Sequence, residues 1–204
     1  MAQLKKIKMS NAPDAVLDRR EAVPALIDHV EDYLVVAGLA GSAQEMTFIA
    51  KDAPNVFAFA GAMGAAPMTG LGLALAQPKR RVLVVTGDGE LLMNLGALAT
   101  IALVNPPNLT IICVDNGHYG ETGNQDSHTG LGVQLDKIAA GAGFPAVFTI
   151  NTLADIPEGR RLLREGNGLT FILLRVKEGP ALKIKRNMHP HIERDRFRAA
   201  LLNG

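Results

Sequence analysis

Short apolar runs alternate with segments of helical periodicity along most of the chain. The apolar runs have the length of strands and end at glycine or at other turn residues; they cover residues 33–38, 56–61, 81–87, 109–116, 146–150 and 169–176. Helices are predicted between them, at residues 19–32, 42–52 (with Ser42 as the N-cap), 67–76, 91–104, 134–143 and 156–166. Regular alternation of this kind is typical of an α/β fold with a parallel sheet, and continuously apolar strands suit a sheet that is covered on both faces. We therefore expect a three-layer, doubly wound parallel sheet of about six strands.

The ends of the chain differ from this middle part. Residues 1–18 are polar and contain a proline, which predicts an N-terminal arm, and residues 19–180 carry the alternating pattern of one domain. Residues 181–204 form a tail that is first basic and then has the pattern of a short amphipathic helix. A partner-docking arm and a solvated tail are equally compatible with this segment.

Composition excludes several classes of function. The net charge is only +1, and the chain has no basic stripe with aromatic residues interleaved in it, so no nucleic-acid partner is expected. No apolar run reaches the length of a membrane span, and MAQLKKIKMSNAPD is not followed by the apolar region of a signal peptide, so a cytoplasmic protein without a membrane partner is expected. The single cysteine, Cys113, lies in the apolar run TIICV and is predicted to be a buried core thiol. One cysteine also excludes a disulfide framework and a cysteine-ligated zinc or iron–sulfur site.

Candidate chemistry lies where two successive strands end. GDG, at 87–89, follows the third predicted strand, and the turn DNG contains Asn116 at the end of the next. In α/β sheets, ligands bind beyond the carboxyl ends of the strands. The Asp88 carboxylate, the Asn116 amide oxygen and the backbone carbonyl of His118 suit Mg²⁺, which would also take two diphosphate oxygens and a water. No lysine or arginine stands in GDGELLMN or DNGHYGETGNQ to neutralise a phosphate, which favours a metal ion. Each turn taken alone is also explained as an ordinary tight turn.

GDG followed after about 25 residues by an asparagine-containing turn resembles the thiamine-diphosphate-binding motif. Over residues 20–180 the chain resembles the pyrophosphate-binding (PP) domain of the thiamine-diphosphate decarboxylase superfamily. DNGHYGETGNQ and GAMGAAPMTGLGLAL are most similar to sulfopyruvate decarboxylase beta subunits and phosphonopyruvate decarboxylases. The chain departs from the common pattern at Asp115, where the family usually has asparagine, and at Glu90, where many relatives have serine.

The resemblance implies a set of site residues. Met63 would be the catalytic residue that presses the two thiamine rings into a V shape, although a methionine among small residues also serves as core filling. The metal ligands would be Asp88, Asn116 and His118. Residues expected to bind the cofactor are Gly41, Ser42, Gly61, Met63, Gly87, Asp88, Gly89, Glu90, Asn116, His118, Tyr119 and Gly120. His128, on the loop GNQDSHTG, is either substrate-facing or simply solvated.

The function implied is that of a PP-domain, beta-type subunit of a thiamine-diphosphate- and Mg²⁺-dependent decarboxylase of a small 2-oxoacid. In this family the glutamate that binds N1′ of the aminopyrimidine comes from a separate pyrimidine-binding (PYR) domain. The resemblance therefore implies a PYR-domain partner, a hetero-oligomer, and self-association of the isolated chain through the partner's surface. An acetolactate-synthase-like carboligase is an alternative, because the same cofactor site serves carboligation. A beta chain of a 2-oxoacid:ferredoxin oxidoreductase would usually carry cysteine clusters, and a non-catalytic nucleotide-binding module lacks support because the P-loop and GxGxxG patterns are absent.

Overall fold

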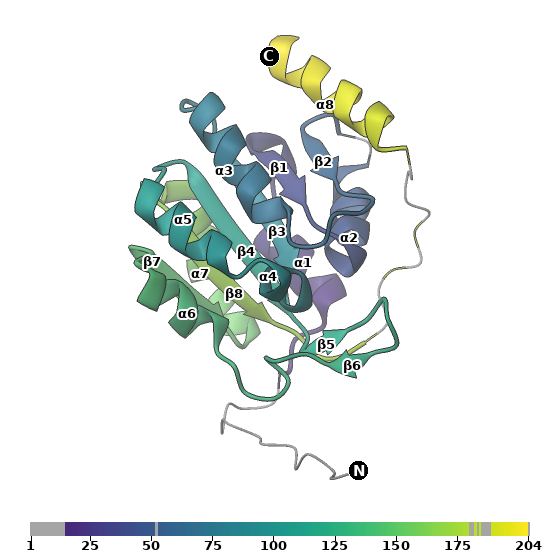
Figure 1. Cartoon of the computed structure of the whole chain (residues 1–204), viewed down its shortest axis with the longest axis vertical. Helices are drawn as coiled ribbons and strands as arrows, with labels where there is room; N and C mark the ends of the chain where they lie inside the picture. Colours follow the sequence, from purple (N-terminus) through teal and green to yellow (C-terminus); the bar gives the residue numbers. More distant parts are fainter. Residues whose placement is uncertain (1–14, 52, 180–181, 183, 185–188, 204) are drawn as a thin grey trace.

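Six parallel strands form the centre of the molecule (Figure 1). The computed structural model describes residues 15–51, 53–179, 182, 184 and 189–203, so most of the expected N-terminal arm and part of the tail lie outside the described residues. The sheet order is β2-β1-β3-β4-β8-β7. The strands are β1 (Leu34–Ala37), β2 (Val56–Ala58), β3 (Val82–Gly87), β4 (Leu109–Asp115), β7 (Ala146–Ile150) and β8 (Thr170–Arg175). The predicted fold class and number of strands are confirmed.

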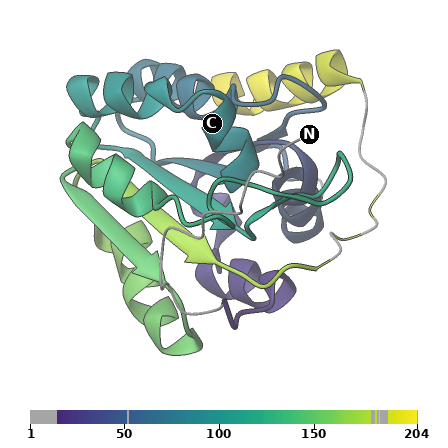
Figure 2. The same cartoon turned by 60° about the horizontal axis from the view of Figure 1, so that its bottom comes forward.

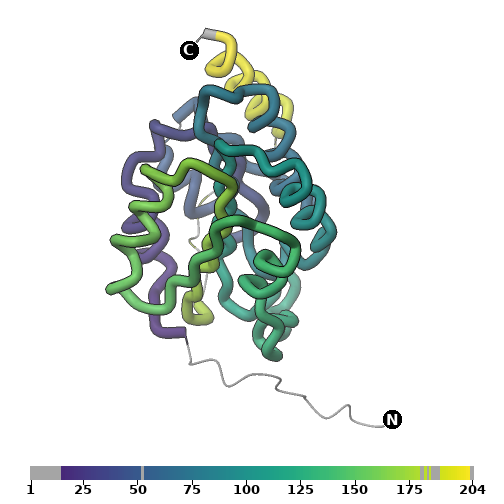
Figure 3. Tube along the Cα trace, turned by 90° about the vertical axis from the view of Figure 1, so that its left-hand side faces the viewer, coloured from purple at the N-terminus to yellow at the C-terminus, as the bar shows by residue number. Residues whose placement is uncertain are grey.

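Helices cover both faces of the sheet. Successive strand residues point to opposite sides, so the apolar side chains of each strand pack against both helical layers. Val84 and Val85 of β3 are both fully buried, one in each of two apolar clusters. One face is covered by α1 (Arg19–Leu26), α2 (Ala40–Ala50) and α7 (Ile156–Glu165). The other is covered by α3 (Ala66–Ala76), α4 (Asp88–Met93), α5 (Gly96–Val104), α6 (Leu135–Ala142) and α8 (Pro190–Asn203). Figures 2 and 3 show the sheet between these two layers.

The strand order creates a crevice at one edge of the sheet. From β1 the chain continues to β2 on one side, while β3 lies on the other side of β1. The helices that follow β1 and β2 therefore lie on opposite faces, because α2 belongs to one layer and α3 to the other. At such a reversal the loops after neighbouring strands separate and leave space for a ligand. The loops after β1 and β3 meet at this point.

Several predicted helix boundaries were wrong. The helix expected at 42–52 begins at Ala40, with Leu39 at its N-cap position, so Ser42 lies in the first turn and is not the N-cap. The helix expected at 91–104 is divided into α4 and α5, since the backbone leaves helical geometry at Asn94, whose Nδ2 donates to the Gly64 carbonyl at 3.3 Å. The helix expected at 19–32 ends at Leu26 and is followed by the 3₁₀ turn η1 (Val30–Asp32). A second 3₁₀ turn, η2 (Leu153–Asp155), precedes α7.

The structure also shows an element that the sequence patterns did not predict. A short antiparallel hairpin, β5 (His118–Tyr119) with β6 (Gln125–Asp126), follows β4. Its strands are only two residues long, which is too short to produce a recognisable alternation of apolar and polar positions.

The parts flanking the alternating region contact the domain. Leu17 is buried and pairs with Val176 beyond β8. In α8, the ring of Phe197 lies 5.9 Å from that of Phe57, and Arg196 Nη2 donates to the Val56 carbonyl at 3.2 Å. Cys113 is a buried free thiol, as predicted. Within the described ranges, each helix is too short or too polar to cross a bilayer.

Candidate functional site

A cavity of about 530 Å³ opens at the carboxyl edge of the sheet, where the loops after β1, β3 and β4 meet. It is lined by almost all the residues that the sequence singled out: Gly41, Ser42, Met63, Gly87, Asp88, Gly89, Glu90, Asn116, His118, Tyr119 and Gly120. Gly61 is solvent-exposed and does not line this cavity. The segment after β8 contributes Glu178 and Gly179. Residues separated widely in the chain thus surround one volume.

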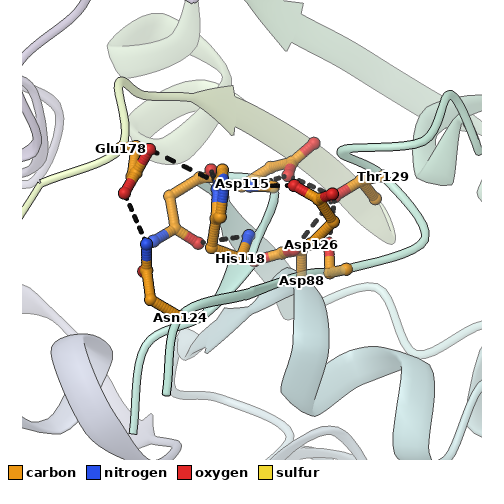
Figure 4. Close-up of polar contacts among 10 residues, drawn as sticks. Asp88, Asp115, His118, Asn124, Asp126, Thr129 and Glu178 are labelled. Carbon is orange, nitrogen blue, oxygen red and sulfur yellow. Dashed lines mark hydrogen bonds and ion pairs between the residues drawn. The ribbon is translucent and has the colours of Figure 1, made fainter. Parts of the chain in front are cut away.

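Asp88 is the most buried carboxylate among the residues that line this cavity, with 2% of its surface exposed. Figure 4 shows its polar contacts. It is the first residue of α4, directly after β3, so its position follows from the end of a buried strand. Its Oδ2 accepts hydrogen bonds from the hydroxyls of Ser127 and Thr129, the latter at 2.9 Å. Burial raises the pKa of Asp88, and the two hydroxyls oppose that rise by stabilising the charged form.

Asp115 lies beside Asp88 at the end of β4 and shares a partner with it. Thr129 Oγ1 is 2.7 Å from Asp115 Oδ1 and 2.9 Å from Asp88 Oδ2. One hydroxyl has one proton to donate, so it cannot satisfy both carboxylates at once. Burial, followed by the negative charge of Asp88, raises the pKa of Asp115 to about 6. Ionising both carboxyl groups therefore costs free energy, and a bound cation would offset that cost.

Asn116 and His118 form a tight turn that leads from β4 into the hairpin. The Asn116 side-chain oxygen accepts from the His118 backbone N–H at 3.2 Å, and His118 Nδ1 lies 2.8 Å from the Asn116 carbonyl oxygen. His118 Nε2 faces the carboxylates of Asp126 and Glu178 at 3.4 and 3.7 Å. Asn124 also donates to Glu178, which ties the hairpin to the segment after β8 (Figure 4).

Glu90 is a second buried carboxylate in the lining of the cavity. Its Oε2 accepts from the Leu39 backbone N–H at 3.0 Å and from Thr86 Oγ1 at 2.9 Å. A Cβ on Gly38 would overlap this carboxyl group, so the approach requires glycine. Burial raises the pKa of Glu90, and its other oxygen, Oε1, is buried with no hydrogen-bond partner in the part of the chain that the structure describes. The carboxyl group joins the loop after β1 to α4 and positions both against the cavity.

Three further residues shape the surface of the cavity. Ser42 is 1% exposed, and its hydroxyl has no hydrogen-bond partner among the described residues. The Tyr119 ring packs on Gly89 so closely that a Cβ there would lie 2.6 Å from ring carbons. Met63 is 43% exposed, which contradicts the core-filling interpretation. His128 lies outside the lining and contacts the Tyr119 hydroxyl through Nδ1 at 3.4 Å.

The donor set fits Mg²⁺ shared with a diphosphate. The described part of the chain has no group of three or more His, Cys, Asp or Glu side chains arranged for a metal ion. Mg²⁺ bound through one or two carboxylates and ligand phosphates does not need such a group. Asp88 offers a buried carboxylate, and Asn116 and His118 offer carbonyl oxygens at the same strand edge. The unpaired Ser42 hydroxyl supplies a hydrogen-bond donor for an oxyanion.

The residues of the site that sequence reasoning missed include Arg19, Ser127, Thr129 and Glu178. Ser127 and Thr129 follow the hairpin in the stretch DSHT, where no spacing rule relates them to Asp88. Their contact with Asp88 depends on the path of the loop after β6. Arg19 begins α1, and Glu178 follows β8, so only the assembled sheet brings them to the cavity.

Comparison with known proteins agrees with this geometry. The family described as "Thiamine pyrophosphate enzyme, C-terminal TPP binding domain" matches residues 38–173. Sulfopyruvate decarboxylase subunit beta of Methanocaldococcus jannaschii is 37% identical over 131 residues, which are 64% of this chain and 69% of that protein. Phosphonopyruvate decarboxylase of Streptomyces hygroscopicus is 34% identical over 91% of this chain, which spans 46% of that protein.

A similarity to a solved structure concerns the fold alone. The thiamine diphosphate-dependent 4-hydroxybenzoylformate decarboxylase of Rhodococcus jostii superposes with a TM-score of 0.66 at 18% identity. The alignment covers 88% of this chain and 36% of that one. The chain thus spans less than half of the larger proteins that it matches.

Proposed function

We propose that this chain, which belongs to the family of thiamine pyrophosphate enzymes, is the PP-domain subunit of a 2-oxoacid decarboxylase. The enzyme would depend on thiamine diphosphate and Mg²⁺. The relatives named sulfopyruvate and phosphonopyruvate decarboxylases support a 2-oxoacid with a second acidic group as the substrate. The observation that carries the proposal is the meeting of Asp88 and Asn116 at neighbouring strand ends, around a cavity that also contains the unpaired Ser42 hydroxyl.

The roles proposed for the metal site follow from the contacts. Asp88 would bind Mg²⁺ with its carboxylate, and Ser127 orients that carboxylate by donating to Oδ2. The single Thr129 hydroxyl proton is shared between this oxygen and Asp115. Asn116 would contribute its amide oxygen and His118 its backbone carbonyl, while the His118 ring faces the carboxylates of Asp126 and Glu178. Mg²⁺ in this place also offsets the repulsion between Asp88 and Asp115.

The remaining residues position the organic part of the site. When bound, the cofactor supplies an electron sink for the electrons released as the 2-oxoacid loses carbon dioxide. Met63 presents an exposed, adaptable apolar side chain against which the rings can rest, and Glu90 holds the loop after β1 at its correct distance. Tyr119 packs on Gly89 and covers the first turn of α4.

A PYR-domain partner completes the proposed site. The Methanocaldococcus relative is named a beta subunit, which supports an assembly with a second kind of chain. Met63 and Met93, 43% and 55% exposed, flank Gly64 beside the cavity, and exposed apolar surface of this kind marks protein contacts. The partner would contribute the glutamate that the aminopyrimidine requires.

The test measures binding of thiamine diphosphate in the presence of Mg²⁺ by titration calorimetry. Asp88→Ala and Asn116→Ala are expected to abolish Mg²⁺-dependent binding, because each removes an oxygen ligand. Asn151→Ala, which replaces an asparagine after β7 that does not line the cavity, is the matched control and should bind normally. Unchanged affinity in Asp88→Ala or Asn116→Ala, with the fold intact by circular dichroism, would contradict the proposed site.

A further inference from the structure

Arg19 is the only lysine or arginine among the described residues that line the cavity. It is the first residue of α1, following the N-cap Asp18, and only 9% of its surface is exposed. Burying a guanidinium requires an opposite charge or several hydrogen-bond acceptors. The position of Arg19 therefore needs an explanation beyond helix stability.

Part of that explanation is an ion pair with Glu45 of α2. Arg19 Nε donates to Glu45 Oε1, and Nη2 donates to Oε2 at 3.3 Å. Glu45 is 1% exposed; burial raises its pKa, and the Arg19 charge opposes that rise. The pair uses two of the three nitrogens of the guanidinium. Among the described residues, no hydrogen bond is found for the third, Nη1.

The guanidinium lies against the backbone at the start of α2. A Cβ added to Gly41 would overlap Nη2 and would lie 2.8 Å from Nη1, so only glycine permits this approach. The next residue is Ser42, whose buried hydroxyl also lacks a partner within the described ranges. Arg19 and Ser42 both line the cavity, and neither Arg19 Nη1 nor the Ser42 hydroxyl has an acceptor among the described residues.

The charge balance of the cavity shows what such donors would bind. The other charged side chains of the lining are the carboxyl groups of Asp88, Glu90, Glu121 and Glu178. A diphosphate brings further negative charge into this acidic cavity, and Mg²⁺ neutralises only two units of it. A guanidinium presents paired N–H groups that match phosphate oxygens in geometry as well as in charge.

We propose that Arg19, with Ser42, forms an oxyanion subsite that binds the diphosphate end of the cofactor, and that Glu45 holds the guanidinium in place for it. The inference rests on the proposed function and adds to it a binding residue that comes from outside the two strand-end turns. Arg19 would therefore contribute to affinity for the diphosphate and not to recognition of the 2-oxoacid.

The experiment titrates the purified chain with pyrophosphate in the presence of Mg²⁺, so that no partner subunit or turnover is needed. Arg19→Ala alone would leave Glu45 buried without its counter-charge, so the informative variant is Arg19→Ala/Glu45→Gln, and Glu45→Gln alone is its matched control. The double variant should bind pyrophosphate about 10- to 100-fold more weakly than the control, the loss expected for a charge-assisted hydrogen bond. Arg20→Ala, which removes an exposed neighbouring arginine, should bind as the unsubstituted chain does.

The outcomes separate this inference from the proposed function. Equal affinities of Arg19→Ala/Glu45→Gln and Glu45→Gln, with both folded by circular dichroism, would overturn the role of Arg19 and leave the metal site standing. Failure of the unsubstituted chain to bind Mg²⁺–pyrophosphate would overturn the diphosphate site and this inference together. In the assembled enzyme, a raised KM for the 2-oxoacid with unchanged affinity for thiamine diphosphate would assign Arg19 to the substrate and would also overturn the proposal.

Discussion

Replacing Asp115 with asparagine should stabilise the metal-free chain at neutral pH. The carboxyl group is 8% exposed and lies beside Asp88, and burial together with that charge raises its pKa to about 6. Asparagine has nearly the same shape, and its side-chain oxygen can still accept from the Gly117 N–H, now at 3.0 Å, and from Thr129 Oγ1, now at 2.7 Å. The substitution therefore removes a charge while it keeps these two hydrogen bonds.

The size of the effect follows from the two pKa values. In the unfolded chain an aspartate titrates at about 3.9, and each unit of difference corresponds to about 1.4 kcal/mol. With a folded-state pKa of about 6, ionising Asp115 lowers the free energy of unfolding by about 3 kcal/mol once the pH is above that value. Between about pH 4 and 6 the folded chain holds more protons than the unfolded chain. The stabilising effect of the protonated carboxyl group is thus complete below about pH 4 and is lost as the pH rises through 6.

Urea unfolding of the metal-free chain and of Asp115→Asn at several pH values would measure this. The variant should be more stable by up to about 3 kcal/mol at pH 7.5, and the difference should shrink to near zero at pH 4. Asp155→Asn gives a control of opposite sign, because backbone N–H groups of Asn151 and Thr152 lower the pKa of Asp155. That variant should be less stable at neutral pH and approach the unsubstituted chain in acid. An Asp115→Asn chain that is equal or inferior in stability at pH 7.5 would refute the reasoning.

Three other predictions concern the site and its partner. Met63→Ala should leave the free energy of unfolding within about 0.5 kcal/mol, because the side chain is 43% exposed, and should lower kcat of the assembled enzyme more than its affinity for thiamine diphosphate; a loss of affinity with kcat preserved would argue against a contact with the rings. Gly89→Ala places a Cβ 2.6 Å from the Tyr119 ring and should destabilise the chain by about 1–3 kcal/mol in urea unfolding, and an unchanged midpoint would show that the ring is free to move. The purified chain, supplied with thiamine diphosphate, Mg²⁺ and a panel of 2-oxoacids, should show no sustained decarboxylation, and turnover without a second polypeptide would exclude the need for a PYR-domain partner.

The middle of the chain shows why the fold was predictable from local patterns. Runs such as RVLVVTG (81–87) are apolar at every position, and β3 is buried on both faces because helices cover the sheet on both sides. Boundaries were less predictable, because they depend on contacts between segments. The division of the helix at Asn94 accompanies a hydrogen bond to Gly64, and the early start of α2 accompanies a hydrogen bond between Leu39 and Glu90. Neither contact has a signal in the local sequence.

The α/β class and the two turns that carry Asp88 and Asn116 were predictable from local patterns, because hydrophobic periodicity and turn chemistry act over a few neighbouring residues. The surroundings of those turns depend on contacts between distant segments. Thr129 contacts both Asp88 and Asp115 only because the loop after the hairpin folds back over the strand ends. Arg19 reaches the cavity only because α1 packs beside α2 with Gly41 at the contact. Such encounters depend on the order of strands and the packing of layers, which place residues side by side irrespective of their separation along the chain.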